Sequence, residues 1–186
     1  MSNNFLIKNT GKYGKGGFAS KNITKGEAIR IFGGKDMGPK DFVEQVNSDK
    51  ENIDDPLQVG KRTYLNLDEV SRSFNHSCDP NAALRKRSEL FALRDIPVGE
   101  EITYDYSLTI APTKWKMRCA CGSKNCRKVL GDILSVPKKR RLEYRKLGAL
   151  QDYMRRLLDK MSKDGFYKMP AYETKLLNSV KKTSNV

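Results

Sequence analysis

Short apolar runs separated by glycine and charged residues dominate the first two thirds of the chain. Runs of this length, rich in β-branched and aromatic residues, are typical of strands rather than helices. The hairpin among them turns at Gly60-Lys61. In the last one, Tyr104 and Tyr106 are two positions apart and would share one face of a strand. The stretches that predict strands or strand pairs are residues 5–8, 28–32, 57–65, 82–93 and 102–106.

Helical spacing appears in the acidic middle of the chain and again near its end. Pro39 is a suitable first helical residue, and the apolar positions after it predict a helix over 39–47. Residues 67–74 predict a helical turn, 137–147 a helix, and a last helix begins at Pro170. Between these two helices an apolar stripe runs to residue 163 through Leu150, Met154, Leu157, Leu158 and Met161. The order of elements predicts a mainly β fold with a helical C-terminal appendage.

A glycine-rich stretch interrupts this pattern at residues 11–19. Its glycines fall at positions 11, 14, 16 and 17, which predicts a loop and not a regular element. Glycine permits close approach of another backbone or of a ligand. A plain hairpin turn is the alternative.

Composition indicates one intracellular domain with an appendage. The chain has 186 residues and a formal net charge of +14. Residues 135–186 hold 14 Lys/Arg against 5 Asp/Glu, or +9, whereas residues 36–58 are acidic. The N-terminus lacks the apolar run of a signal peptide, and no apolar stretch reaches the roughly 18 residues of a membrane span. The two charged regions predict different partners.

The four cysteines predict one structural zinc site. Cys119, Cys121 and Cys126 follow a Cys-x-Cys-x4-Cys spacing, and Cys78 lies far upstream. Four thiolates are the number that tetrahedral zinc prefers. Two disulfides are the alternative, which the close spacing and the missing signal peptide disfavour.

Three motifs in a fixed order identify a family resemblance. Residues 75–81 read Asn-His-Ser-Cys-Asp-Pro-Asn, residues 99–106 read Gly-Glu-Glu-Ile-Thr-Tyr-Asp-Tyr, and the cysteine cluster follows. From about residue 8 to 130 the chain resembles the SET-domain lysine methyltransferases with a post-SET zinc segment, and its small size resembles stand-alone prokaryotic members. The resemblance implies small sheets around a pseudoknot. It divides the chain into a SET domain at 1–107 with an acidic insert at 36–58, a zinc segment at 108–134, and a basic helical extension at 135–186.

The resemblance also implies which residues act. Tyr106 would be catalytic with Tyr104 beside it, and Tyr64 and Tyr104 would line the substrate site, although packing is the commoner role of a strand tyrosine such as Tyr64. Trp115 or Leu130 would contact the adenine, with core packing as the alternative for Trp115. The residues implied to bind S-adenosylmethionine are Lys15, Gly16, Gly17, Phe18, Asn75, His76, Tyr106, Trp115 and Leu130. Lys128 departs from the family, which usually has glycine there.

The expected function is methylation of lysine in a basic, histone-like protein, with mono- or dimethylation favoured by Tyr104. The acidic insert would face that substrate, or it is an ordinary solvated helix and loop. The basic extension predicts contact with nucleic acid, or it is a solvated surface; residues 137–141 (Pro-Lys-Lys-Arg-Arg) also resemble a nuclear import signal. The alternative functions are a non-catalytic zinc module that binds nucleic acid through the basic tail, and an inactive SET scaffold.

Overall fold

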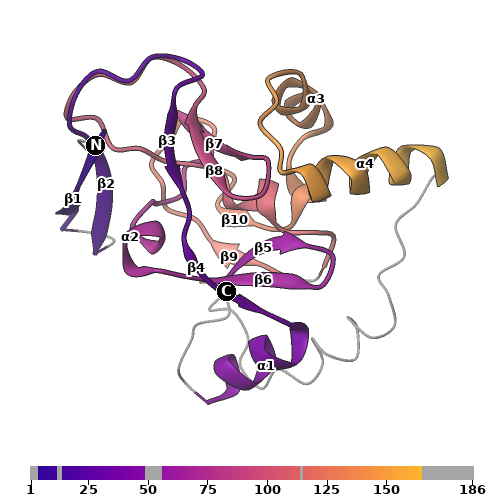
Figure 1. The fold of residues 1–186 in the computed structure, drawn as a ribbon. Coiled ribbons are helices and arrows are strands. Elements are labelled where there is room, and N and C mark those ends of the chain that lie inside the picture. The colour runs from indigo at the N-terminus through magenta and orange to yellow at the C-terminus, as the bar shows by residue number, and fades with distance from the viewer. Residues whose placement is uncertain (1–3, 12–13, 49–55, 114, 165–186) are drawn as a thin grey trace.

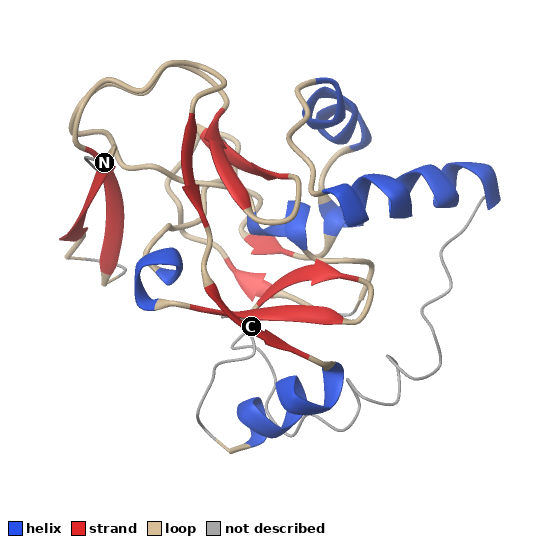
Figure 2. Cartoon of the chain, in the orientation of Figure 1, coloured by secondary structure: helices blue, strands red, loops and turns tan. Residues whose placement is uncertain are grey.

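Small antiparallel sheets make up most of the protein in the computed structural model, which describes residues 4–11, 14–48, 56–113 and 115–164. Helices lie around the outside of these sheets (Figure 1, Figure 2). The strands are β1 (Phe5–Asn9), β2 (Lys15–Ala19), β3 (Ala28–Ile31), β4 (Gly34–Met37), β5 (Leu57–Gly60), β6 (Thr63–Leu67), β7 (Ala82–Arg85), β8 (Glu89–Ala92), β9 (Met117–Arg118) and β10 (Val129–Leu130). The helices are α1 (Pro39–Asn47), α2 (Glu69–Arg72), α3 (Lys138–Lys146) and α4 (Asp152–Asp164), with 3-10 turns η1 (Tyr106–Thr109) and η2 (Ile133–Ser135).

The glycine-rich stretch is partly a strand, so the prediction of a loop across residues 11–19 was wrong for its second half. β2 pairs with β1 over its whole length, and Gly17 lies opposite Ile7. A side chain at Gly17 would meet the Phe74 ring at 2.6 Å. The missing Cβ therefore lets a strand lie directly on an aromatic ring.

Two three-stranded sheets, β3-β8-β7 and β4-β6-β5, form the centre of the fold. The predicted pair within residues 82–93 is β7 and β8, which align Ala82 with Ala92. β4 was missed, because residues 34–37 read Gly-Lys-Asp-Met and have no apolar alternation. It forms because β6 supplies a pairing edge, with Gly34 opposite Leu67.

Helix α1 has the bounds that the sequence predicts. Pro39 is its first residue, and Asp41 accepts a hydrogen bond from the Gly38 amide at 3.1 Å. Its apolar face buries Phe42, Val43 and Val46. Asp41 therefore caps the helix. The acidic residues at 49–55 lie outside the described residues.

Tyr104 and Tyr106 are not on one strand, in contrast to the prediction for residues 102–106. Tyr104 makes a single parallel bridge with His76, and Tyr106 starts the 3-10 turn η1. Asp105 ends the extended backbone by capping η1: its carboxylate accepts the Ser107 amide at 3.1 Å. The local cap has overridden the strand pattern.

The C-terminal helices are part of the folded body and not a free tail. They lie on one side of the molecule, away from β1 and β2 (Figure 1). Gln151 donates to the Arg87 carbonyl on the β7–β8 turn, and the Asp152 amide donates to the Lys86 carbonyl at 2.7 Å. The helix predicted from Pro170 lies outside the described residues. We call the cluster that these helices complete the appendage core: Ala83, Phe91, Leu108, Ala111, Ile133, Val136, Tyr144, Ala149, Leu150, Tyr153 and Met154.

A separate sheet core lies beneath the predicted active site. Phe74 is almost fully buried in it and contacts Phe5 and Phe32 at ring-centroid distances of 5.1 and 5.4 Å. Tyr104 is also a member, 6% exposed. Tightly packed aromatic rings resist displacement, so this core can hold the neighbouring residues in fixed positions.

Candidate active site and metal centre

The segment after α2 runs beside the tyrosine segment and pairs with it through main-chain hydrogen bonds. The Tyr104 amide donates to the Asn75 carbonyl at 3.1 Å, and the Ser77 amide donates to the Tyr104 carbonyl at 3.2 Å. Cap formation at Asp68, whose side chain accepts the Ser71 amide, positions the short helix that leads into this segment. Two motifs almost 30 positions apart in the sequence are thereby joined.

The glycine strand forms the next wall of the same site. Asn75 Nδ2 donates to the Lys15 carbonyl at 3.1 Å and to Glu101 Oε1 at 2.7 Å. The Ile102 amide donates to the Gly17 carbonyl at 2.7 Å. A Cβ on Gly16 would lie 2.6 Å from Glu101 Oε1. The structure thus brings together Lys15, Gly16, Gly17, Asn75 and His76, which the sequence predicts as cofactor residues.

Tyr104 and Tyr106 approach each other despite lying on different elements. Their ring centroids are 4.8 Å apart and tilted by 48°. Phe32 contacts Tyr104 edge-on at 5.7 Å. The Tyr106 hydroxyl donates to the Phe74 carbonyl at 3.0 Å, which fixes the direction of its O–H bond. The result is an aromatic wall with one oriented phenol oxygen.

Two of the predicted site residues lie in other surroundings. The Tyr64 ring stacks on Phe42 of α1 at 4.7 Å, which is the packing role weighed for it, and its substrate role stays a prediction. Phe18 is half-buried on β2, where Lys8 lies over its ring at 5.6 Å.

All four cysteines gather at one place. Cys78 Sγ lies 3.8 Å and Cys126 Sγ 3.7 Å from Cys119 Sγ. The Cys78 amide donates to Cys121 Sγ at 3.5 Å. Two sulfurs on tetrahedral zinc, with Zn–S bonds of about 2.3 Å, are about 3.75 Å apart. The sulfur spacing therefore fits zinc, and the cysteines are free thiols with no disulfide among them.

His76 also lies against this cluster and competes with Cys126 as a ligand. His76, Cys78, Cys119 and Cys121 have ligand atoms within 4.8 Å of one another. The Tyr106 amide donates to His76 Nδ1 at 3.2 Å, so the proton of the neutral ring is on Nε2. Nε2 is 3.3 Å from Cys78 Sγ and is placed to donate to it. A protonated nitrogen does not bind metal, and the geometry favours the four cysteines.

The electrostatics of the cluster follow from burial. Burial, followed by the charge of Arg127, lowers the pKa of His76 to about 3, so the ring is neutral at pH 7. Burial raises the pKa of both Cys78 and Cys119. Burial opposes the shift at Cys121, but hydrogen bonds from Ser123 and the Cys78 main chain lower its pKa to about 6. A divalent cation stabilises thiolates, so metal binding would overcome the burial cost.

A buried ion pair beside the cysteines was not predicted as part of the site. Arg127 Nη2 donates to Asp105 Oδ1 at 2.5 Å, and the two side chains are 15% and 2% exposed. Burial raises the pKa of Asp105, and the charge of Arg127 opposes that shift. The sequence pattern does not indicate the pair, because on the predicted strand Asp105 would point away from the face of Tyr104 and Tyr106.

Leu130 and Trp115 belong to the cysteine cluster. Leu130 is fully buried with Cys78 and Cys119, and Trp115 packs against them. This is the packing alternative for Trp115, and contact of either residue with adenine stays a prediction. Lys128 has φ of 64°, a left-handed conformation that glycine adopts without strain. This backbone conformation explains why the resemblance leads one to expect glycine at this position.

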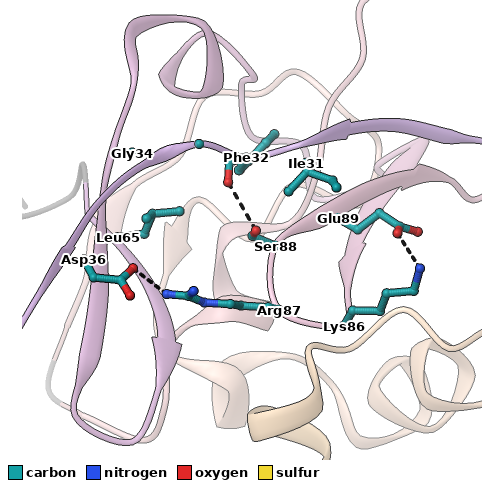
Figure 3. A pocket seen from close by; sticks show the side chains of 10 residues that line it. Ile31, Phe32, Gly34, Asp36, Leu65, Lys86, Arg87, Ser88 and Glu89 are labelled. Atoms are coloured by element: carbon teal, nitrogen blue, oxygen red, sulfur yellow. Dashed lines mark hydrogen bonds and ion pairs between the residues drawn. The ribbon is translucent and has the colours of Figure 1, made fainter.

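An open cavity of about 340 Å³ lies elsewhere, between the end of β3, β4 and the β7–β8 turn. Figure 3 shows Leu65 on one wall and ion pairs at both ends, Arg87 with Asp36 and Lys86 with Glu89. Its lining contains none of the residues predicted to bind cofactor, substrate or metal. Asp36, an acid of the insert, thus has a structural partner.

The sequence is similar to those of known proteins. The family model described as SET domain matches residues 14–107. The variant-silencing SET domain-containing protein of Plasmodium falciparum is 37% identical over 137 residues, and histone-lysine N-methyltransferase 2B of Homo sapiens is 33% identical over 136. These matches cover 64% and 63% of the chain and 5% of each relative, so the chain corresponds to a small part of either protein.

Solved structures show the same fold. The methyltransferase domain of human histone-lysine N-methyltransferase SETMAR superimposes with a TM-score of 0.58 at 23% identity, covering 71% of this chain and 59% of that one. A Chaetomium thermophilum Polycomb Repressive Complex 2 structure gives 0.52 at 18% identity, covering 59% and 15%. Every helix in the described ranges is too short or too polar to cross a membrane.

Proposed function

The chain belongs to the SET-domain family, and from that premise we propose that it methylates lysine side chains of proteins with S-adenosylmethionine as methyl donor. Two of its relatives carry the name histone-lysine N-methyltransferase. The observation that carries the proposal is the meeting of three segments, the glycine strand, Asn75-His76 and Tyr104–Tyr106, around one aromatic wall. A protein that only bound nucleic acid through a zinc segment would not need this arrangement of three segments.

The glycine strand and Asn75 form the cofactor cradle. Gly16 and Gly17 are buried, and a side chain at either position would collide with Glu101 or Phe74. Asn75 donates to the Lys15 carbonyl and to Glu101, so its side chain has a fixed orientation in which it would meet the amino acid part of the cofactor. When bound, S-adenosylmethionine supplies an electrophilic methyl on a positively charged sulfur. A preformed polar cradle reduces the ordering cost of binding.

The aromatic wall prepares the substrate amine. A free lysine, with a pKa of about 10.4, is almost wholly protonated at neutral pH and has no lone pair to react. An apolar aromatic channel disfavours the ammonium form by desolvation, and a nearby positive charge disfavours it further, so the substrate pKa falls. Loss of the ammonium proton to water would leave the nitrogen with the lone pair that it needs to accept the methyl group. Tyr104 and Tyr106 provide that channel.

Tyr106 is the residue we assign to the transition state. Its hydroxyl proton is directed to the Phe74 carbonyl, so the oxygen presents acceptor lone pairs to an amine or to a methyl group that carries partial positive charge. An interaction that strengthens as the methyl moves lowers the barrier rather than tightening substrate binding. Dipoles fixed by the Phe74 core need no reorientation.

Zinc is proposed as a structural ion held by Cys78, Cys119, Cys121 and Cys126, whose spacing fits it. It would tie the segment at 108–134 to the motif that begins at Asn75. His76 would donate to the Cys78 thiolate, as its geometry indicates.

The finer proposals concern the substrate. The acidic insert at 36–58 favours a basic, histone-like protein, and Tyr104 favours mono- or dimethylation. The basic extension at 135–186 would contact nucleic acid, and the protein would act in the cytoplasm, in the nucleus or at the nucleoid. These proposals rest on charge and on the family.

Replacement of Tyr106 by phenylalanine tests the catalytic assignment. Tyr106→Phe removes one oxygen and should abolish turnover of a histone mixture while S-adenosylmethionine still binds in calorimetry. The matched control is Tyr144→Phe, which removes a hydroxyl from α3 and should leave turnover unchanged. Near-normal activity of Tyr106→Phe would show that the catalytic residue is misassigned. Absence of any binding heat for the unaltered protein would instead favour the nucleic-acid-binding alternative.

A further inference from the structure

Arg127 combines a buried guanidinium with contacts to two different parts of the site. It directly follows Cys126, and its main-chain amide donates to Cys78 Sγ at 3.4 Å. Its side chain donates to Asp105, the residue that caps the turn carrying Tyr106. One residue therefore contacts both the cysteine cluster and the anchor of the tyrosine segment.

Two donors of this guanidinium lack acceptors in the structure. Arg127 Nε and Nη1 are buried and make no hydrogen bond among the described residues. A buried donor without an acceptor costs about 1–3 kcal/mol, and more if it is charged, so such groups usually mark a missing partner. The Cys78 sulfur is the neighbouring candidate acceptor, since it already accepts the Arg127 main-chain amide at 3.4 Å. Thiolates appear when a metal binds, and they are strong acceptors for N–H donors.

The balance of charge around the cysteine cluster also indicates a role for Arg127. Four thiolates around a divalent ion carry a net charge of −2, and the Asp105 carboxylate beside them adds another negative charge. The His76 ring accepts the Tyr106 amide at Nδ1 and so adds no positive charge, and Arg140 contacts the Cys78 carbonyl from a half-buried position. Arg127 is the deeply placed cation in this group. Without it, the buried region would hold an excess of negative charge at low effective dielectric, which is unfavourable.

We propose that Arg127 is the counter-charge of the thiolate metal centre and, through Asp105, the positioning residue that links this centre to the Tyr106 segment. This inference rests on the proposed zinc site. Arginine suits the role because its planar fork can meet a carboxylate on one side and sulfur on the other. His76 completes the link, since it accepts the Tyr106 amide and donates to Cys78.

The test compares the rate at which zinc leaves the protein under a thiol-reactive reagent, followed with a coloured zinc chelator. Arg127→Met keeps the length of the side chain and removes its charge and donors. We expect zinc release to be roughly tenfold faster or more, the range typical for loss of an outer-shell partner of a metal ligand. Arg127→Lys retains the charge without the fork and should fall between Arg127→Met and the unaltered protein. The control is Arg118→Met, which removes an exposed cation from β9 and should release zinc at the unaltered rate.

A second readout separates positioning from general stability. In Arg127→Met, kcat should fall while KM for S-adenosylmethionine changes little, and Arg127→Lys should recover part of kcat. Release of zinc from folded Arg127→Met at the unaltered rate would overturn the inference and leave the proposed methyltransferase function intact. If Arg127→Met does not fold, Arg127→Lys decides, and an unaltered release rate for it has the same meaning. An unaltered protein that contains no zinc would instead overturn the proposed metal site.

Discussion

Lys128 has a backbone conformation that lysine rarely adopts. Its φ of 64° brings Cβ close to the neighbouring carbonyl, at a cost of about 1–2 kcal/mol for a residue with a side chain. The strain is tolerated because the Cys119 amide donates to the Lys128 carbonyl at 2.7 Å and closes the cysteine loop. The turn that closes the cysteine loop is therefore formed even though lysine is strained in this conformation.

Lys128→Gly should therefore stabilise the protein. The relief of strain is partly offset by the greater freedom of glycine in the unfolded chain, and we expect a net gain of about 0.5–1 kcal/mol in the free energy of unfolding. Urea denaturation of the zinc-loaded protein measures it. Lys124→Gly, at a neighbouring exposed position without positive φ, is the control and should be neutral or destabilising. Equal stability changes in both variants would contradict the role of backbone strain.

Tyr104 offers a second single-residue prediction, on the number of methyl groups transferred. In the proposed site its hydroxyl would occupy space that a methylated amine needs in order to rotate for another transfer. Tyr104→Phe should add methyl groups with little loss of the first transfer, in contrast to Tyr106→Phe. Mass spectrometry of a methylated target is the measurement. Predominant trimethyl-lysine from the unaltered enzyme in a single encounter would rule out Tyr104 as the limiting residue.

For single residues, the sequence predicted which side chains belong to the site better than it predicted their interaction partners. Asn75, His76 and the cysteines are set in short motifs whose chemistry depends on their own identity, and the structure brings them together. The Asp105–Arg127 pair depends on how a separate segment folds back, which spacing along the chain does not encode. The tautomer of His76 likewise depends on the Tyr106 amide.

Among the elements, those with local signals were predicted best. α1 follows from Pro39 and an apolar face, and β7 and β8 follow from two apolar runs around a turn. β4 has no such signal, because pairing with β6 decides it. β2 was not predicted because of its glycines. One of them, Gly17, is required because a side chain there would collide with the Phe74 ring. Tertiary contacts thus determined the elements that periodicity missed.

Helix α3 makes the clearest prediction at the element scale, since part of its basic run is structural. Arg140 donates to the Cys78 carbonyl at 3.3 Å and to Asp79 Oδ1 at 3.1 Å. Arg141 donates to the carbonyls of Ile133 and Leu134. The run is therefore not solely an exposed import signal.

Arg140→Met should lower the free energy of unfolding by about 1 kcal/mol, because the lost hydrogen bonds involve a charge but the side chain is partly solvated. Chemical denaturation with zinc bound provides the value. Lys139→Met removes the adjacent, exposed charge and is the control, with no change expected. Equal effects of the two variants would mean that α3 is held by the appendage core alone.

For the whole molecule, the appendage core makes the C-terminal helices and the SET fold one structural unit. Leu108 and Ala111 follow the tyrosine motif, yet they pack with Tyr144, Tyr153 and Met154 of the extension. The boundary expected at residue 135 is therefore crossed by shared packing. Such burial predicts one cooperative unfolding transition rather than two.

Removal of zinc should affect this entire unit. Thiolate–zinc binding contributes folding free energy on the order of 10 kcal/mol. Chelation should therefore lower the melting temperature strongly and abolish activity, and both should return when zinc is restored. Metal analysis and calorimetry together provide the measurement. Active protein with far less than one zinc per chain would contradict a structural role for the ion.

The charge distribution leads to the last prediction, that the basic extension binds nucleic acid. Some of its cations, such as Arg140 and Arg141, donate hydrogen bonds within the protein. These side chains are therefore less available to bind phosphate. Others are exposed on α3 and α4: Lys138, Lys139, Lys146, Arg156 and Lys160. Binding through phosphates releases counterions, so the affinity for duplex DNA should fall with salt at a slope of about −0.9 per contact.

A double replacement, Lys138→Gln with Lys139→Gln, tests which cations make these contacts. If both contact phosphate, the salt slope in gel-shift titrations should become shallower by about 2 and binding should weaken alike for all sequences. Lys25→Gln with Lys35→Gln removes the same charge from exposed positions outside the extension and should leave the slope unchanged. Equal losses in both double variants would attribute binding to net charge alone, and an affinity insensitive to salt would exclude phosphate contacts. Since α3 also contacts the Cys78 turn through Arg140, a true phosphate site here would place the nucleic acid beside the metal centre and bring its bound basic proteins near the lysine site.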